Sequence, residues 1–235
     1  MSYHPETHEI SKRYARRNPI DDRYNPLNAA VYLSVQEKER AIINLLKTSN
    51  LAPLNTKRML EIGSGSGGNL LQFIKLGAEP HNLVANELLE DRLALARVLL
   101  PSGVTILPGD ASELPFDQSS FDIIIQSTVF SSLLDDTFQA LLAARMWHWT
   151  KPGGGILWYD FTYNNPRNPD VRGMPLRRIR ALFPEAQIRA WRLTLAPPLS
   201  RRVTRLHPNL YHLFNLLPFL RTPLLCWIAK PRGTV

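Results

Sequence analysis

The sequence predicts an α/β fold in which a mostly parallel sheet carries helices on both faces. Short apolar runs alternate with helix-like stretches between residues 58 and 161. A glycine-rich turn joins the first apolar run to the first helix-like stretch, and a second glycine-rich turn at 151–155 precedes the fifth run. Alternation of this kind favours parallel strands that are connected by right-handed crossover helices.

The individual elements follow from this pattern. Residues 1–35 are expected to be irregular or weakly helical, and residues 34–46 to form a helix whose apolar side carries Val35, Ile42, Leu45 and Leu46. Strands are expected at 58–62, 82–86, 103–107, 121–126 and 154–161, helices at 68–76, 88–99 and 134–149. A short helix at 177–183 and a sixth strand at 187–195 complete this part of the chain.

The most informative segment is MLEIGSGSGGNL at residues 59–70. A short apolar run enters a series of alternate glycines, Gly63, Gly65 and Gly67, and the chain then continues as a helix. Glycine permits a tight turn and lets a ligand approach the backbone, and the helix start offers unpaired N–H groups. The segment therefore predicts a nucleotide-type cofactor site after the first strand.

Two cofactor classes fit this turn. The spacing G-x-G-x-x-G from Gly63 to Gly68 is typical of dinucleotide binding, and Glu87 lies about twenty residues on, where a carboxylate accepts a ribose hydroxyl. The spacing E-x-G-x-G-x-G from Glu61 to Gly67 equally fits a site for S-adenosylmethionine. The glycines alone leave both classes open.

The segments that follow distinguish the two classes. They are NLVANE at 82–87, LPGDASELPF at 107–116, SFDIIIQ at 120–126 and KPGGG at 151–155. In this order and at this spacing they resemble the class I S-adenosylmethionine-dependent methyltransferase family, and within it the branch of the ubiquinone/menaquinone-type methyltransferases. The resemblance covers residues 57–162 and a last strand at 224–230.

The resemblance implies a Rossmann-like, seven-stranded sheet with an antiparallel last strand, and S-adenosyl-L-methionine as cofactor, with S-adenosyl-L-homocysteine as product. It places Asp110 near the exocyclic amine of adenine. The residues expected to line the cofactor site are Glu61, Gly63, Ser64, Gly65, Gly67, Glu87, Leu88, Asp110, Ala111 and Gln126. The resemblance further implies that the N-terminal segment closes over the cofactor through Tyr14, Tyr24 or Tyr32.

Length and composition agree with one domain. The 235 residues are expected to divide into an N-terminal cap segment and helix, 1–50, and a methyltransferase domain, 51–235. The single cysteine, Cys226, excludes an internal disulfide framework, and no metal site is expected. Because no signal-peptide or membrane-spanning run is evident, we expect a cytoplasmic protein, with peripheral contact at the inner membrane face left open.

Positive charge is concentrated in the last third of the chain. Residues 1–150 contain 14 Lys and Arg against 17 Asp and Glu, whereas residues 151–235 contain 14 against 3. This asymmetry indicates an anionic partner, either a phosphorylated substrate, a nucleic acid or a membrane surface. The fourth strand ends in QSTV rather than the N/D-P-P-Y/F of amino-group methyltransferases, which disfavours a specific nucleic-acid substrate.

The segment WYDFTYNNPRNPDVRG at 158–173 indicates the acceptor. It resembles methyltransferases of bacterial surface-polysaccharide clusters, which implies O-methylation of a sugar hydroxyl on a phosphorylated or carrier-linked glycan. Tyr163, Arg167 and Arg172 are the expected substrate-binding residues, because arginine holds phosphate bidentately. A lipid or quinone hydroxyl is the alternative acceptor. A general base assists a hydroxyl nucleophile, and Asp160 and His207 are the candidates.

An insertion at 197–223 precedes the last strand. Leu206, Leu210, Leu213, Phe214 and Leu217 recur there at helical spacing, close to several arginines. A helix packed over the core or against another subunit is the favoured interpretation, and a basic, apolar-faced helix on a membrane is the other. Two further function classes stay open. They are an NAD-dependent oxidoreductase, although no Tyr-x-x-x-Lys proton donor is found, and a catalytically silent S-adenosylmethionine-binding module.

Overall fold

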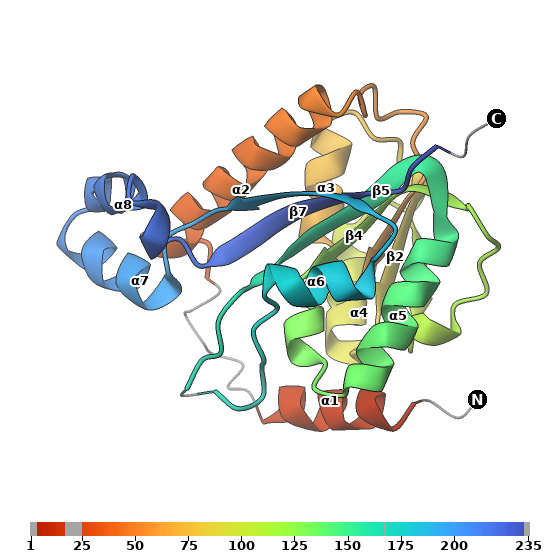
Figure 1. Ribbon diagram of the computed structural model, residues 1–235, viewed down its shortest axis with the longest axis horizontal. Coiled ribbons are helices and arrows are strands. Elements are labelled where there is room, and N and C mark those ends of the chain that lie inside the picture. Colours follow the sequence, from red (N-terminus) through yellow and green to blue (C-terminus); the bar gives the residue numbers. More distant parts are fainter. Residues whose placement is uncertain (1–3, 17–24, 167, 233–235) are drawn as a thin grey trace.

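The computed structural model describes residues 4–16, 25–166 and 168–232, and its centre is a seven-stranded sheet in the order β3-β2-β1-β4-β5-β7-β6 (Figure 1). The strands are β1 Met59–Ile62, β2 Leu83–Glu87, β3 Thr105–Pro108, β4 Phe121–Ser127, β5 Thr150–Phe161, β6 Gln187–Arg192 and β7 Pro223–Ala229. Strands β1 to β5 pair in parallel, and β7 runs antiparallel to both β5 and β6. The expected fold class is confirmed.

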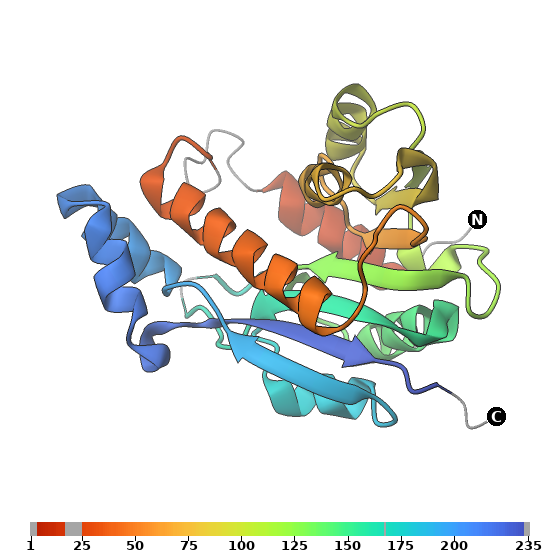
Figure 2. The ribbon, with the colours of Figure 1, turned by 90° about the horizontal axis from the view of Figure 1, so that it is seen from above.

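Helices cover both faces of this sheet. The α-helices of the described residues are α1 Pro5–Ala15, α2 Ala29–Thr48, α3 Gly68–Lys75, α4 Glu90–Leu99, α5 Asp136–Trp149, α6 Leu176–Leu182, α7 Pro197–Leu206 and α8 Asn209–Asn215, and the last two stand beyond the edge of the sheet. In Figure 1, α5 and α6 lie in front of the strands and α3 and α4 behind them, and Figure 2 shows α2 running along the sheet. The sheet is thus the middle of three layers, as a parallel sheet requires.

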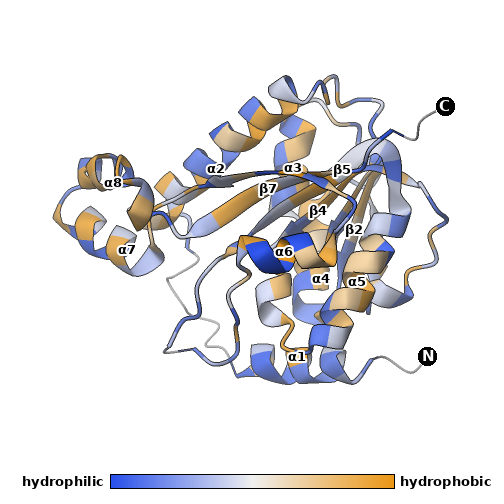
Figure 3. Ribbon diagram, viewed as in Figure 1, coloured by the Kyte–Doolittle hydropathy of each residue, from blue (hydrophilic) through white to orange (hydrophobic). Residues whose placement is uncertain are grey.

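Each face of the sheet carries its own apolar core, and the apolar helix residues turn toward it (Figure 3). On the α5 side, Phe138 and Met146 pack against Ile124 and Trp158 of the strands. On the α3 side, residues of α2, α3 and α4 pack against the opposite face of the same strands. Cys226 of β7 is fully buried and acts as a small apolar residue, as the sequence predicts.

The N-terminal region is more ordered than the sequence predicts. The helix α1 forms within the region expected to be irregular or weakly helical, and His4 accepts a hydrogen bond from the Glu6 N–H at its start. Helix α2 begins at Ala29, capped by the Asn28 side chain, rather than at residue 34. Val35 was expected on the apolar side of α2 but is 40% exposed.

Two further expectations need correction. The turn expected at 151–155 is part of β5, whose pairing with β4 shifts register between Phe121 and Ile123. The insertion contains two helices rather than one, because Pro208 has no N–H to continue α7 and starts α8 instead. We call residues 197–220 the helical lobe. No helix of the described residues is both long and apolar enough to cross a membrane.

The strand order places a crevice at the carboxyl ends of β1 and β4. Strand order reverses there, because β2 and β3 lie on one side of β1 and β4 and β5 on the other. Open α/β sheets bind ligands at such a switch point. The glycine-rich turn between β1 and α3 lies at this edge, and so does the end of β2 at Glu87.

Gly67 provides the first test of this local geometry. It caps α3 with φ +90°, and a Cβ built there would lie 2.6 Å from the Leu100 side chain. Gly68, the next residue, has open space at its Cβ position and lies inside the helix. We expect Gly67→Ala to lower the free energy of unfolding by about 2 kcal/mol or more, through a left-handed backbone and a steric clash.

The matched variant Gly68→Ala should leave stability unchanged or slightly higher, because alanine is the better helix former. Urea denaturation of both variants checks the pair. Equal stability of the two would contradict the conformation assigned to Gly67.

Candidate active site

The glycine-rich turn is shaped by its backbone. Gly63 and Gly65 adopt φ values of +62° and +58°. A Cβ on Gly63 would lie 2.6 Å from Val129, whereas nothing lies within 4 Å of a Cβ on Gly65. The Ser64 N–H donates to the Asn86 carbonyl at 2.9 Å and so ties the turn to β2. The turn therefore has open space beside Gly65, whereas the Val129 side chain lies close against Gly63.

Glu87 connects the ends of two strands. Its Oε2 atom accepts a hydrogen bond from the Gly65 N–H at 2.7 Å. Its Oε1 atom accepts from the N–H groups of Leu88 and Leu89, both at 2.9 Å. The carboxylate thus lies against the glycine turn and at the start of the segment that leads into α4, where the resemblance implies a ribose-binding acid.

Asp110 follows β3 and lies beside the start of α1. Its Oδ1 atom accepts hydrogen bonds from the N–H and the hydroxyl of Ser112, both at 2.8 Å. Its Oδ2 atom accepts from the His4 N–H at 3.3 Å. One oxygen of Asp110 is therefore held by its own turn, and the other faces the N-terminal segment through a long hydrogen bond.

A cavity of about 100 Å³ lies between these strand ends and α1. Five residues expected in the cofactor site line it: Gly63, Glu87, Leu88, Asp110 and Ala111. Helix α1 covers the cavity with Thr7 and Ile10, which the sequence did not indicate, and with Tyr14, which was expected only from the family resemblance. Arg92 of α4 also lines it and stacks over the Tyr14 ring at 4.6 Å.

Helix α1 is held over the cavity by a buried ion pair. Arg13 Nη2 donates to Glu6 Oε1 at 2.6 Å, and both side chains are less than a tenth exposed. Arg13 also donates to the Ser132 carbonyl, and Glu6 accepts from the Leu134 N–H at 2.7 Å. These contacts join α1 to the loop between β4 and α5.

Glu61 lies beneath the glycine turn and is fully buried. Its Oε1 atom accepts from Asn69 Nδ2 at 2.6 Å, and Asn69 in turn accepts from Lys38 Nζ at 2.9 Å. Glu61 Oε2 and Ser64 Oγ are buried without a partner among the described residues. Burial raises the pKa of Glu61 to about 8 and also lowers the pKa of Lys38. Glu61 and Lys38 are thus connected through the side-chain amide of Asn69.

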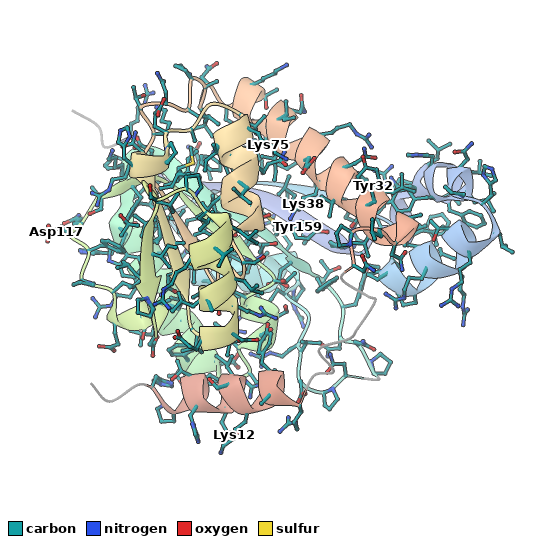
Figure 4. The ribbon with its side chains drawn as sticks, turned by 180° about the vertical axis from the view of Figure 1, so that it is seen from behind. Lys12, Tyr32, Lys38, Lys75, Asp117 and Tyr159 are labelled. Atoms are coloured by element: carbon teal, nitrogen blue, oxygen red, sulfur yellow. The ribbon has the colours of Figure 1, made fainter. Side chains whose placement is uncertain are left out.

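Lys38 extends this polar chain toward β5. Figure 4 shows Lys38 reaching from α2 toward Tyr159, and its Nζ lies 5.2 Å from the centre of that ring. The Tyr159 hydroxyl shares a 3.1 Å hydrogen bond with Thr194, and burial raises its pKa to about 12. The motifs of the sequence did not indicate Lys38, because it lies on α2, outside all of them.

Asp160 and Gln126 are fully buried and bonded mainly to backbone. Asp160 accepts from the N–H groups of Ser131 and Phe161 at 3.0 and 2.9 Å, and burial raises its pKa to about 7. Gln126 accepts from the Val129 N–H at 3.1 Å. Neither lines the cavity described above. The expected catalytic role of Asp160 stays a prediction, and its observed contacts hold the loop after β4.

The expected substrate residues lie apart from the cavity. Arg172 pairs with Asp136 at 2.5 Å, and Tyr163, 54% exposed, accepts a hydrogen bond from Arg192 at 3.0 Å.

His207, the second candidate for a general base, is exposed at the end of α7 and accepts a hydrogen bond from the Asn209 N–H. Tyr32 is 53% exposed on α2, near the lobe in Figure 4. Arg167 and Tyr24 lie outside the described residues.

The charges around the turn distinguish between the two cofactor classes. Glu87 occupies the Gly65 N–H, which a dinucleotide pyrophosphate would need, and places a carboxylate beside it. Asp110 adds a second carboxylate at these strand ends, whereas Glu61 is a buried acid whose raised pKa keeps it mainly neutral below about pH 8. Such a site repels a pyrophosphate and attracts a cation such as a sulfonium or an ammonium group. Among the described residues, no cluster of His, Cys, Asp and Glu has the arrangement of a metal site.

The raised pKa of Glu61 makes stability depend on pH. In the unfolded chain Glu61 has its ordinary pKa of 4.5, and in the folded protein about 8. Its protonated form therefore supports folding fully below pH 4.5, and this contribution is lost as pH rises toward 8. We expect Glu61→Gln, which keeps a neutral acceptor, to reduce the loss of stability across this range, by on the order of a few kcal/mol.

Urea denaturation at a series of pH values measures this difference. Glu79→Gln is the matched control, since Glu79 is an exposed glutamate whose side chain forms no capping hydrogen bond. The prediction fails if the wild-type and Glu61→Gln curves run parallel from pH 4.5 to 8.

Comparisons with known proteins agree with this geometry. Residues 59–154 match the family described as methyltransferase domain. The chain is 39% identical over 101 residues to the biotin biosynthesis bifunctional protein BioHC of Cellvibrio japonicus, covering 43% of this chain and 20% of that protein. It is 31% identical over 176 residues to a phthiotriol/phenolphthiotriol dimycocerosates methyltransferase of Mycobacterium tuberculosis, covering 72% of this chain and 60% of the relative.

Solved structures of methyltransferases have a similar fold. An S-adenosylmethionine-dependent methyltransferase from Mesorhizobium loti superimposes with a TM-score of 0.59 at 17% identity, over 79% of this chain and 96% of that one. The chain spans at most 60% of the length of the two curated relatives. The matched segment contains the glycine turn, Glu87 and Asp110. Residues 59–154 thus match a methyltransferase domain, and the chain shares its fold with a methyltransferase that depends on S-adenosylmethionine.

Proposed function

We propose that this protein transfers the methyl group of S-adenosylmethionine to a hydroxyl group of a lipid. The observation that carries the cofactor half is the set of three acids, Glu61, Glu87 and Asp110, around an open glycine turn. The acceptor half rests on the relatives named for phthiotriol and phenolphthiotriol dimycocerosates, which are triol-derived lipids. These relatives favour the lipid hydroxyl over the sugar hydroxyl expected first.

The residues present fit the cofactor. The open face at Gly65 admits a ligand against the backbone, and Gly63 has no room for a side chain. Glu61 Oε2 and Ser64 Oγ are buried polar atoms that still lack a partner among the described residues. The Glu87 carboxylate would hold ribose hydroxyls, Asp110 the adenine amine, and the turn the amino-acid portion. When bound, the cofactor supplies an electrophilic methyl group on a sulfonium that leaves as a neutral thioether.

The protein then has mainly to position and enclose the reactants. Methyl transfer needs the acceptor oxygen, methyl carbon and sulfur in line, so orientation supplies most of the acceleration. Helix α1 covers the cavity with Ile10 and Tyr14, and the adjoining loop and the start of α5 contribute Leu133 and Phe138. These side chains exclude water from the site. The proton of the acceptor hydroxyl has Asp160 or His207 as its proposed recipient, which the sequence suggested.

Cofactor affinity provides the decisive test. We expect S-adenosylhomocysteine to bind with micromolar affinity in isothermal titration calorimetry. Asp110→Asn keeps an acceptor for Ser112 but replaces Oδ2 with a donor group, so affinity should fall about tenfold or more. Asp117→Asn is the control, since Asp117 is exposed and far from α1 and α2 in Figure 4. Binding of NAD⁺ in place of S-adenosylhomocysteine would contradict the cofactor assignment.

The acceptor is tested separately with methyl-labelled S-adenosylmethionine. A long-chain diol or triol in detergent micelles and a set of nucleotide-linked sugars are offered in parallel, and products are identified by mass spectrometry. We expect label on the lipid hydroxyl. Label on sugar alone would refute the lipid acceptor and leave methyl transfer standing, whereas binding without any transfer to a wide acceptor set would favour a silent cofactor-binding module.

The role of α1 gives a further prediction. Glu6→Ala leaves the Arg13 guanidinium buried without its carboxylate, which costs about 3–5 kcal/mol in comparable pairs. We expect α1 to detach, trypsin to cleave faster at Lys12 and Arg13, and affinity for S-adenosylhomocysteine to fall about tenfold. Glu9→Ala removes the exposed pair with Lys12 on the same helix and should change neither measurement. Unchanged affinity in Glu6→Ala would show that α1 does not enclose the cofactor.

A further inference from the structure

The helical lobe projects from the carboxyl edge of the sheet. It leaves β6 after Arg192, which pairs with Leu224, and returns into β7 at Pro223, which pairs with Phe161 at the end of β5. In Figures 1 and 2 the lobe stands beyond one end of α2. Because β1, β2 and β4 end at the same edge, the lobe and the cavity share one side of the molecule.

The inner face of the lobe is fixed to the domain. Val203 and Tyr211 are buried with Leu195, and Leu199, Leu210 and Phe214 pack around them. The Tyr211 hydroxyl donates to Glu37 Oε2 at 2.6 Å, and Glu37 Oε1 accepts from the Thr194 N–H. This agrees with the favoured interpretation of the insertion as a packed helix, but it accounts for only one face.

The outer face of the lobe is apolar and exposed. Leu206 is 81% exposed, Leu213 59%, Leu216 70%, Leu217 43% and Phe219 71%. Leu213 lies in α8, and Leu216 and Leu217 directly follow its last residue, so these exposed leucines gather at the end of α8, whereas Leu210 and Phe214 pack inward. Figure 3 shows hydrophobic residues along the ribbon of α8. Exposed large apolar side chains gathered in this way mark an interaction site.

Positively charged side chains lie on the helical lobe beside this apolar face. The chain contains no Asp or Glu after Glu185. Arg202 and Arg205 of α7 are exposed and form no ion pair with any described residue, and Arg201 lies beside them. Their helix also carries the apolar Leu206 at its end. Charge complementarity therefore requires an anionic partner with an apolar interior.

We propose that the helical lobe docks on the surface of an anionic lipid bilayer, with the outer leucines and Phe219 in the acyl boundary and the arginines at the headgroups. Short amphipathic helices with leucine and phenylalanine on one face and arginine beside it bind membranes in this way. A protein partner with a complementary surface would need acids around an apolar groove. A second copy of this lobe offers no acids, and its arginines would repel those of the first.

Vesicle sedimentation tests the two halves of this surface. The full-length protein should sediment with vesicles of phosphatidylcholine and phosphatidylglycerol, and far less with phosphatidylcholine alone or at high salt. Leu213→Ser with Leu216→Ser should weaken binding about tenfold or more, and so should Arg202→Gln with Arg205→Gln. These side chains are solvent-exposed, so the variants should fold normally.

Matched controls come from the remainder of the surface. Leu95→Ser with Val98→Ser removes two exposed apolar residues of α4, and Lys47→Gln with Lys75→Gln removes two exposed cations of α2 and α3. Neither pair should change vesicle binding by more than about twofold. Equal weakening by lobe and control variants would overturn the proposal, since it would show only a diffuse charge or solubility effect.

A fluorescent label tests insertion directly. Cys226 is the only cysteine and is buried in β7, so Leu216→Cys and Val98→Cys can each be labelled with an environment-sensitive dye. The dye at 216 should shift to the blue on anionic vesicles, and the dye at 98 should not. No shift at 216, or a shift at 216 without vesicles together with dimer formation in analytical ultracentrifugation, would overturn the proposal. Neither result depends on methyl transfer, so this test stands apart from the proposed function.

Discussion

The contact of Glu87 with Gly65 is the constraint on which the cofactor edge depends. One carboxylate accepts hydrogen bonds from the turn after β1 and from the chain leaving β2. This holds two strand ends at a fixed separation, and Gly63 of the turn lines the cavity beside Glu87. Glycine is required at 65 because the backbone has φ +58°. A side chain is required at 87 because the turn otherwise lacks an acceptor.

The same contact sets the charge of the site. A helix N-terminus ordinarily attracts anions, yet here an acid of the protein occupies the N–H that a ligand anion would take. With the Asp110 carboxylate lining the same cavity as Glu87, the site is negative around a backbone that is partly positive. A cofactor with a sulfonium, an ammonium and a carboxylate offers both signs of charge, whereas a pyrophosphate offers only the disfavoured one.

Much of the fold could be predicted from sequence because apolar periodicity records which residues face the core. Strands β1 and β4 are found within one or two residues of expectation, and the antiparallel β7 followed from family resemblance. The motif residues Gly63, Glu87 and Asp110 do line one cavity. Contacts between elements that are distant in the sequence could not be predicted from it. No spacing rule indicates that Arg13 pairs with Glu6 under a loop near residue 132, or that Lys38 reaches Asn69.

In the lobe, the sequence indicated an apolar helix but did not indicate which of its apolar residues are exposed. Leu206, Leu213 and Leu217 fit one helical repeat with Leu210 and Phe214, and helical repeats usually mean core. Pro208 divides the segment into two helices. Leu210 and Phe214 pack inward, whereas Leu206, Leu213 and Leu217 are exposed. Sequence periodicity detects an apolar face, and only the packing of neighbouring elements shows which face is covered.

The lobe and the cofactor turn are connected through α2. Tyr211 of the lobe bonds Glu37, and Lys38, the next residue, reaches Asn69 and through it Glu61 beneath the glycine turn. Thr194 joins the same group by bonding both Glu37 and Tyr159. Buried polar groups of this kind fix orientation, because each unmade hydrogen bond is costly in a low dielectric. A surface that binds the lobe therefore also fixes the direction in which the carboxyl edge of the sheet faces. For an acceptor that resides in a lipid layer, that orientation brings the crevice to the acceptor and removes the need to extract it into water.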